Sequence, residues 1–321
     1  MAAAAQPATV TRAEGGPVEQ KRNRPVPRTG RLTPYLFLAP FVVLFLTFII
    51  VPAVYGIWIS LHDYDYLLPN KPWVGLRNYT SLFDSTSRDA SDFWRSMRAT
   101  GIFTVFSVPF LLIVPLGVAL LLNRAFPGRT FFRAVFFTPY VLGVAVVGVL
   151  FRFILEPTIG VVNYYLGVLG LPQPAWITSL PWAWVSLVGM TVWWTLGFNS
   201  IIYLAGLQDI PIDLYEAAEV DGANWWQRFR NVTLPGLRPV LLFVLTVTIL
   251  ASANMFGQAY LVTHGAPENE TRTAIMYIAE TGLRQFRQGA AAAMGYILAF
   301  ALILISLMNF RLFRSSDIEE S

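Results

Sequence analysis

The stretch that decides the fold is Pro34-Tyr-Leu-Phe-Leu-Ala-Pro-Phe-Val-Val-Leu-Phe-Leu-Thr-Phe-Ile-Ile-Val-Pro-Ala-Val-Tyr-Gly-Ile-Trp-Ile-Ser60. These 27 residues include no charged side chain. A helix of about 20 apolar residues crosses the hydrocarbon core of a bilayer, whereas the apolar core of a signal peptide has only about 7–15. The run is therefore long enough to be a first membrane span.

Similar apolar runs recur along the rest of the chain. They lie near 99–122, 134–155, 182–208, 237–261 and 290–310. Each is long enough to cross the hydrocarbon core as a helix. The sequence predicts an all-α membrane protein with six transmembrane helices.

The composition of the 321 residues agrees with a lipid-solvated surface. Hydrophobic residues make up 55% of the chain and charged residues 13%, and the mean hydropathy is +0.54. Soluble domains have about 25% charged residues. Cysteine is absent, which excludes a disulfide framework and thiolate ligands. The basic residues lie in short segments between apolar runs, so we expect membrane lipid and not nucleic acid as a partner.

The distribution of Lys and Arg predicts how the spans are oriented. With six spans, the side that holds both termini has 14 basic residues outside the spans and the other side has 8. We expect the chain to lie in the inner or plasma membrane of the cell. The positive-inside rule then places both of its termini in the cytoplasm. We expect a flexible basic tail over 1–32, a transmembrane domain over 33–314 and a C-terminal tail over 315–321.

The segment 209–235, between the fourth and fifth predicted spans, is too polar for a membrane and too patterned for a linker. It predicts two short cytoplasmic helices. Asp213 and Glu216 have the spacing of a capping box at the start of the first helix. Gly222 allows the chain to turn, and Asn224 is suited to cap the second helix. Leu234 and Pro235 are expected to end that second helix.

Several residues of this loop have the type and spacing of a family signature: Glu216-Ala217-Ala218, Gly222, Val232, Leu234 and Pro235. In this set the chain resembles the EAA loop of permease subunits of binding-protein-dependent ABC importers. Further stretches, such as Phe137-Thr-Pro-Tyr140, resemble the carbohydrate-uptake branch, which is of the maltose and glycerol-phosphate type. The resemblance covers roughly residues 33 to 314.

The resemblance implies the assembly in which the chain works. It predicts a second homologous permease, an ATP-binding cassette ATPase dimer and an extracytoplasmic solute-binding protein as partners. ATP and Mg would be bound by the ATPase, and this chain would bind no cofactor. The loop would be the coupling helix that docks on the ATPase. The resemblance places that coupling role on Glu216, Ala217, Ala218, Asp221, Gly222, Ala223, Leu234 and Pro235.

Polar and aromatic residues within the fourth and fifth spans are candidates for a substrate pathway. They are Trp194, Asn199, Tyr203, Asn254, Gln258 and Tyr260. Aromatic rings stack on the C–H faces of sugars, and amides bond to their hydroxyls. Hydrogen bonding between helices explains the same residues equally well. In some relatives only one of the two permeases holds the substrate, and the identity of the sugar is open.

The residues missing from the spans exclude other mechanisms. Transport coupled to protons or sodium usually uses carboxylates or histidines at membrane depth, and the spans contain none. Arg152 and Glu156, spaced i,i+4 at the outer end of the third span, are expected to form a local salt bridge. His62 and His264 lie at outer helix ends, so no metal or catalytic site is expected.

An enzyme and a stand-alone facilitator are the alternatives to an ATP-driven permease. Neither Lys21 nor Lys71, the only lysines, stands in a Walker A frame, so ATP hydrolysis is expected on another subunit. An intramembrane enzyme would need a nucleophile with a base or metal ligands, which the spans lack, and we expect no enzyme. A stand-alone facilitator not powered by ATP remains as the alternative, although it has no use for a docking loop.

Overall fold

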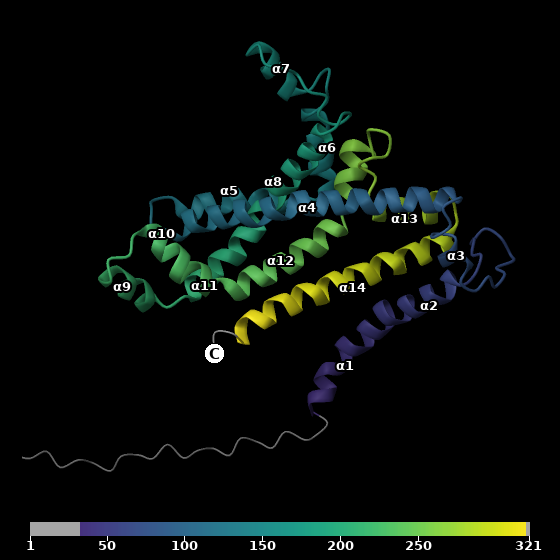
Figure 1. The fold of residues 1–321 in the computed structure, drawn as a ribbon, viewed down its shortest axis with the longest axis horizontal. Coiled ribbons are helices and arrows are strands. Elements are labelled where there is room, and N and C mark those ends of the chain that lie inside the picture. The colour runs from purple at the N-terminus through teal and green to yellow at the C-terminus, as the bar shows by residue number, and fades with distance from the viewer. Residues whose placement is uncertain (1–32, 319–321) are drawn as a thin grey trace, which may run out of the picture. The chain divides into compact units, whose positions relative to one another are not determined.

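The computed structural model describes residues 33–318, and the chain divides into two compact units, Met1–Pro52 and Ala53–Ser321 (Figure 1). In the first unit, α1 (Thr33–Phe45) passes through a π-helical turn, η1 (Leu46–Ile50), into the start of α2 (Val51–Ser60). Every side chain from 35 to 52 is exposed. The apolar helix Tyr35–Ser60 matches the first predicted span. The predicted tail over 1–32 lies outside the described residues.

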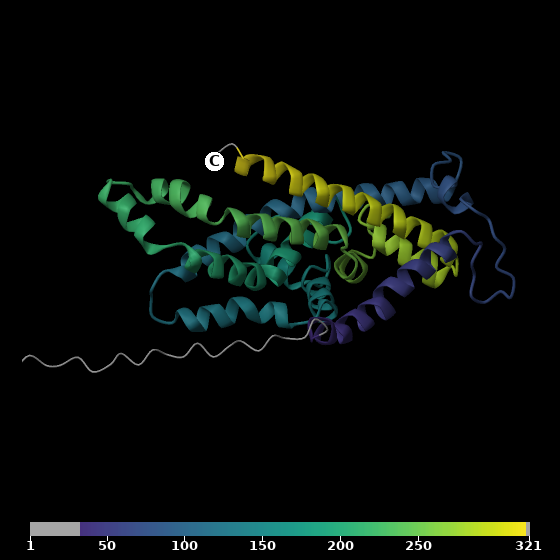
Figure 2. The same ribbon diagram turned by 90° about the horizontal axis from the view of Figure 1, so that it is seen from below.

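The second unit is helical along most of its length, and Figures 1 and 2 show its elements from two directions. After α2 its elements, in chain order, are α3 (Arg77–Thr80), α4 (Arg88–Asn123), α5 (Arg129–Val141), α6 (Val144–Ile154), α7 (Val161–Val168), α8 (Trp182–Asp209), α9 (Ile212–Val220), α10 (Trp225–Arg228), η2 (Phe229–Thr233), α11 (Leu234–Gly236), α12 (Arg238–Ala253), η3 (Ala259–Thr263), α13 (Ala274–Ala279), η4 (Glu280–Arg284) and α14 (Gln288–Ile318). The part of the chain predicted as a C-terminal tail is helical as far as Ile318, and 319–321 lie outside the described residues.

Four helices are long and apolar enough to cross a membrane, or up to six if each of two bent helix pairs counts as one span. The four are Tyr35–Ser60, Arg88–Asn123, Trp182–Asp209 and Gln288–Asn309. The bent pairs are α5 with α6, at 93°, and Trp225–Gly236 with α12, at 68°. The all-helical class is confirmed for the described residues. The third predicted span is bent between α5 and α6, and the fifth, 237–261, is a regular helix only from Arg238 to Ala253 and is interrupted before η3.

The bend in the third predicted span has a local cause. Pro139 lies inside α5 and cannot donate a backbone hydrogen bond, and Gly143 takes an extended conformation before α6 starts. The carbonyl of Leu142 accepts a hydrogen bond of 2.9 Å from the indole N–H of Trp194 on α8. A side chain of another helix therefore satisfies a backbone group that the break has freed.

The core of the second unit lies where α4, α8 and α12 pack against one another. One buried cluster joins Phe103 on α4 with Leu187 and Met190 on α8 and Met255 just beyond α12. A second cluster, nearer the predicted cytoplasmic end, surrounds Tyr203. These helices are thus held by apolar contacts along most of their length.

Ion pairs fasten the segment between η3 and α14 to the start of α4. Glu270 accepts hydrogen bonds from Arg95 and Arg98, while Arg287 pairs with Asp89. The nearly buried Arg272 adds a fourth ion pair, 3.0 Å from Asp92. Composition and spacing did not reveal these pairs, because their partners are more than 170 residues apart in the sequence.

Gly197 brings α8 into contact with the backbone of α5. A Cβ atom added at Gly197 would lie 2.3 Å from the carbonyl oxygen of Phe136 and 2.5 Å from the Cα of Phe137. Both are backbone atoms of α5, so no side chain can move aside. A glycine is therefore required for this close helix approach.

We predict that Gly197→Ala lowers the free energy of unfolding by about 1–3 kcal/mol, because the methyl group must push the two helices apart. Thermal unfolding in detergent micelles measures the change. Gly189→Ala on the same helix is the matched control, since no atom lies within 4 Å of its added Cβ. An equal loss of stability in both variants would contradict the close approach.

Candidate functional site

The predicted loop 209–235 folds as two short helices joined by a tight turn at Gly222. Gly222 has a φ of +76°, which is favourable for glycine and costly for other residues. The amide of Gly222 donates to the carbonyl of Glu219 (3.0 Å), and that of Ala223 donates to Ala218 (2.9 Å). This bond pattern is a Schellman motif, which ends α9 and satisfies its last carbonyls. The predicted turn at Gly222 is confirmed.

The two predicted caps have different outcomes. Asn224 accepts from the amide of Gln227 (3.0 Å), and the side chain of Gln227 accepts from the amide of Asn224 (2.7 Å), which completes a capping box for α10. The predicted cap at Asp213 is wrong, because α9 already starts at Ile212, after Pro211. Pro211 supplies the fixed φ of a helix start and leaves Asp213 within the first turn.

Two side-chain contacts join the helices of the loop into one body. The hydroxyls of Tyr215 on α9 and Thr233 on η2 lie 3.1 Å apart, and Arg228 on α10 pairs with Glu219 on α9 at 2.9 Å. Thr233 is buried. The prediction that Leu234 and Pro235 end the helix is wrong. Helical backbone runs on to Gly236 because Pro235 lies in the first turn of α11, where its missing N–H is tolerated.

One face of α9 is exposed although part of it is apolar. Glu216 and Ala217 are exposed and Ala218 is half-buried, so the signature residues point mostly outward. Val220 is 88% exposed and Ile212 66%. A small helix that combines exposed apolar side chains with carboxylates is suited to dock on another protein.

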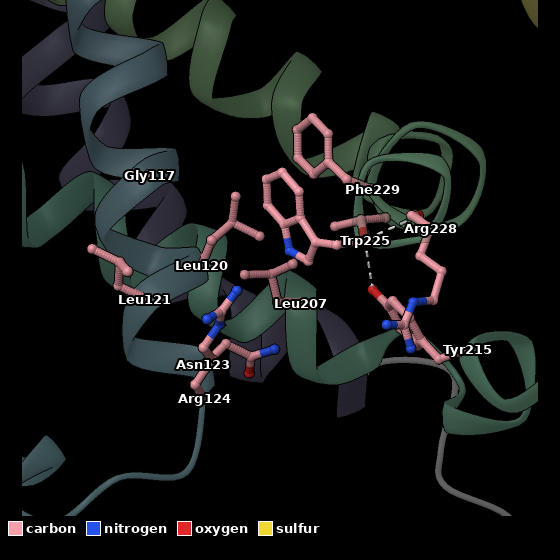
Figure 3. Close-up of a pocket in the computed structure, with 11 residues that line it drawn as sticks. Gly117, Leu120, Leu121, Asn123, Arg124, Leu207, Tyr215, Trp225, Arg228 and Phe229 are labelled. Carbon is pink, nitrogen blue, oxygen red and sulfur yellow. Dashed lines mark hydrogen bonds between the residues drawn. The ribbon is translucent and has the colours of Figure 1, made fainter. Parts of the chain in front are cut away.

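The loop covers a pocket of about 550 Å³ at the ends of α4 and α8 (Figure 3). Figure 3 shows Trp225 and Phe229 above Leu120 and Leu207, with Arg124 and Tyr215 at opposite sides. The loop therefore faces the ends of α4 and α8 with large aromatic side chains, and the pocket leaves free space between them.

A second cavity, of about 470 Å³, lies among α4, α8, α12 and the break between α5 and α6. Asn199, Asn254 and Gln258 line it together with aromatic rings, and none of its lining residues is charged. The side chain of Asn199 donates to the carbonyl of Leu111 (3.2 Å), and that of Asn254 donates within its own helix to Leu250 (2.8 Å). Both amides retain acceptor oxygens for a further partner.

Four of the six candidate pathway residues line this cavity: Trp194, Asn199, Asn254 and Gln258. Tyr203 does not, although it shares a helix face with Asn199, because Leu237 and Val244 bury it one turn further along α8. Tyr260 also lies outside the lining and accepts a hydrogen bond from Arg284 (2.7 Å).

The structure adds lining residues that the sequence analysis missed. Tyr140 and Phe198 stack with ring centroids 4.6 Å apart, and Thr195 and Thr248 add hydroxyls. Tyr140 precedes the break that ends α5, so only the bend brings it to the cavity. No regular helical spacing predicts that position.

The expected salt bridge between Arg152 and Glu156 is wrong. Glu156 accepts from the amides of Thr158 and Ile159, both at 2.7 Å, because α6 ends at Ile154 and the chain turns there. The Arg152 guanidinium instead lies 3.2 and 3.1 Å from the two ring nitrogens of His264. Residues 33–318 include no group of three His, Cys, Asp or Glu side chains placed to hold a metal ion.

Comparison with known proteins gives consistent matches over most of the chain. The family model described as Binding-protein-dependent transport system inner membrane component matches residues 24–317. The arabinooligosaccharides transport system permease protein AraP of Bacillus subtilis is 33% identical, with 88% of each chain covered. The trehalose/maltose transport system permease protein MalF of Thermococcus litoralis is 35% identical, with 84% of this chain and 89% of that one covered.

A solved structure shares the fold. A chain in the crystal structure of a bacterial alginate ABC transporter, in complex with an alginate pentasaccharide-bound periplasmic protein, matches with a TM-score of 0.76. The two chains are 27% identical, and the match covers 88% of this chain and 94% of that one.

We predict that Asn224→Ala loosens the loop locally. Loss of the capping box costs about 1 kcal/mol, which corresponds to roughly fivefold faster amide exchange at Gln227 and Arg228. Hydrogen exchange followed by mass spectrometry measures it. Asn231→Ala, an exposed residue of η2 without a side-chain hydrogen bond, is the control. Unchanged exchange in Asn224→Ala would contradict the cap.

Proposed function

This chain belongs to the family of binding-protein-dependent transport system inner membrane components, and we propose that it is the permease through which a separate ATPase drives the import of a carbohydrate. The observation on which the proposal mainly rests is a continuous connection. The exposed face of α9 is linked by Tyr215 and Thr233 to the helical run that continues into α12, and α12 lines the uncharged cavity.

The chemistry of the cavity supports a sugar as the solute. Trp194, Tyr140 and Phe198 offer ring faces, and Asn199 and Gln258 offer amide groups for hydroxyls. Aromatic faces beside amides match the two surfaces of a sugar ring. The names of AraP and MalF point to oligosaccharides and disaccharides, which is the same class of solute.

We infer the membrane topology from the spans and the basic residues. The α5–α6 pair counts as one span and α12 belongs to another, with the loop 209–235 outside the membrane; with six spans, both termini and the coupling loop then lie in the cytoplasm. The segments around α7 and between η3 and α14 lie on the opposite side, where an extracytoplasmic solute-binding protein docks.

The loop 209–235 is the part of the chain through which ATP hydrolysis by the ATPase drives transport. Glu216, Ala217 and the apolar side chains of Ile212 and Val220 form the face that docks on one subunit of the ATPase dimer, which binds ATP and Mg. The loop acts as one body because of its internal bonds, so a displacement of α9 is passed through the Tyr215–Thr233 contact to the helical run that bends by 68° into α12. A second homologous permease completes the pathway, and the two alternate between inward-open and outward-open packings.

A stand-alone facilitator is the competing function. It would need the cavity but would have no use for an exposed, partly apolar docking helix, whose exposure in water carries an aggregation risk. The behaviour of α9 toward an ATPase therefore separates the two functions.

We predict that the ATPase co-purifies with the tagged chain in mild detergent and that Glu216→Arg reduces its recovery at least tenfold, because the reversed charge opposes docking. Quantitative mass spectrometry of the purified complex measures the recovery. Glu268→Arg, an exposed glutamate on the opposite predicted side, is the matched control. Absence of an ATPase from the wild-type preparation, or its full recovery with Glu216→Arg, would favour the facilitator.

A further inference from the structure

Two arginines lie beside a pair of stacked rings next to the cavity. Arg152, near the end of α6, contacts the ring of His264, and Arg284, at the end of η4, donates to the hydroxyl of Tyr260. The Arg284 guanidinium also lies over the Tyr260 ring, 5.5 Å from its centroid. Tyr260 and His264 stack with centroids 5.7 Å apart. We call these four residues the arginine–aromatic cluster.

The cluster continues the lining of the cavity. Phe256 lines the cavity and stacks on Tyr260 with centroids 5.2 Å apart, so Phe256, Tyr260 and His264 form a ladder of rings. Val144, at the other end of α6 from Arg152, lines the cavity too. A solute that leaves the cavity along this ladder meets the two guanidinium groups.

Neither guanidinium of the cluster has a carboxylate partner among residues 33–318. This is unusual for the segment, since the other two arginines of 262–289, Arg272 and Arg287, are both paired with carboxylates. Glu156, which could neutralise Arg152, is held by the amides at the end of α6. The positive charge of the cluster is therefore left for a ligand.

His264 does not neutralise the positive charge of Arg152 and Arg284, because its imidazole carries no negative charge. Burial, together with the Arg152 and Arg284 guanidiniums, lowers the pKa of His264 below its ordinary value, which favours the neutral ring. The contact with Arg152 requires a neutral imidazole. The Arg152 guanidinium can only donate hydrogen bonds, so a ring nitrogen of His264 must accept one. The backbone of His264 has a φ of +53°, and such strain in a non-glycine residue often marks a functional site.

We propose that the arginine–aromatic cluster binds the carboxylate or other anionic group of an acidic sugar through the guanidiniums of Arg152 and Arg284. The proposal rests on the proposed function and makes it more specific, because it adds a negative charge to the solute class. Guanidiniums bind carboxylates and other oxyanions with several aligned N–H donors. The uncharged cavity then takes the neutral sugar units that precede or follow the acidic one.

The test uses a matched pair of probes, galacturonate and galactose, which differ only in a carboxylate in place of a hydroxymethyl group. Saturation-transfer NMR on the purified complete importer, at constant ionic strength, gives the Kd of each probe. We expect galacturonate to bind at least about tenfold more tightly than galactose, and Arg152→Gln or Arg284→Gln to reduce this ratio to near one. Arg284→Lys should keep part of the preference because it keeps the charge.

Arg88→Gln is the matched control, since it removes an exposed arginine from the same predicted side of the membrane without touching the cluster. It should leave the ratio unchanged. A wild-type ratio near one, binding of neither probe, or a preference that persists in the double variant Arg152→Gln/Arg284→Gln would overturn the proposal.

The counterpart of the cluster is alternatively an acidic side chain of the solute-binding protein. In that case the arginine variants weaken the affinity of that protein for the importer while the wild-type importer shows no preference between the two probes. That outcome also overturns the proposal. Recovery of the ATPase is measured on the same samples, so failure of the proposed function, which appears as loss of the ATPase, is distinguishable from failure of the acidic-sugar site.

Discussion

Every peptide group that lipid surrounds must find its hydrogen-bond partner inside the protein, and this constraint shapes the whole chain. Continuous helices satisfy it in Tyr35–Ser60, α4, α8 and α14. Where a helix breaks, another group must replace the lost partner, as Trp194 does for the carbonyl of Leu142. The breaks after α5 and after α12 both border the cavity, which agrees with the rule that irregular backbone at membrane depth lines a protein interior.

The proposed coupling between the loop 209–235 and the cavity depends on the same arrangement of helices. A straight helix transmits displacement along its axis, and α12 joins the loop at one end and the cavity at the other. The Schellman turn at Gly222 and the capping box at Asn224 fix the geometry of the loop without help from a partner. The exposed face of α9 is therefore preorganised, which would lower the entropic cost of the proposed docking.

The sequence predicted what depends on local chemistry. Apolar length predicted the straight spans, and a glycine and an asparagine at the right spacing predicted the turn and cap of the loop. The prediction of side-chain contacts failed where a distant helix or an unforeseen helix end determines the partner. Tyr203 and Asn199 have the same helical face, yet only α12 determines which of them reaches the cavity. Arg152 and Glu156 have ideal spacing, but the helix end at Ile154 gives Glu156 better partners in nearby amides.

The proposed docking of α9 on an ATPase can be tested directly in native membranes. The chain contains no cysteine, so Ala217→Cys introduces a single thiol on the exposed face of α9. A photoactivatable cross-linker attached to that thiol in native membranes, followed by mass spectrometry, identifies the neighbouring protein. We predict cross-links to an ATP-binding cassette ATPase. Cross-links that never include an ATPase, or labelling of the thiol from outside intact cells by a membrane-impermeant reagent, would contradict it.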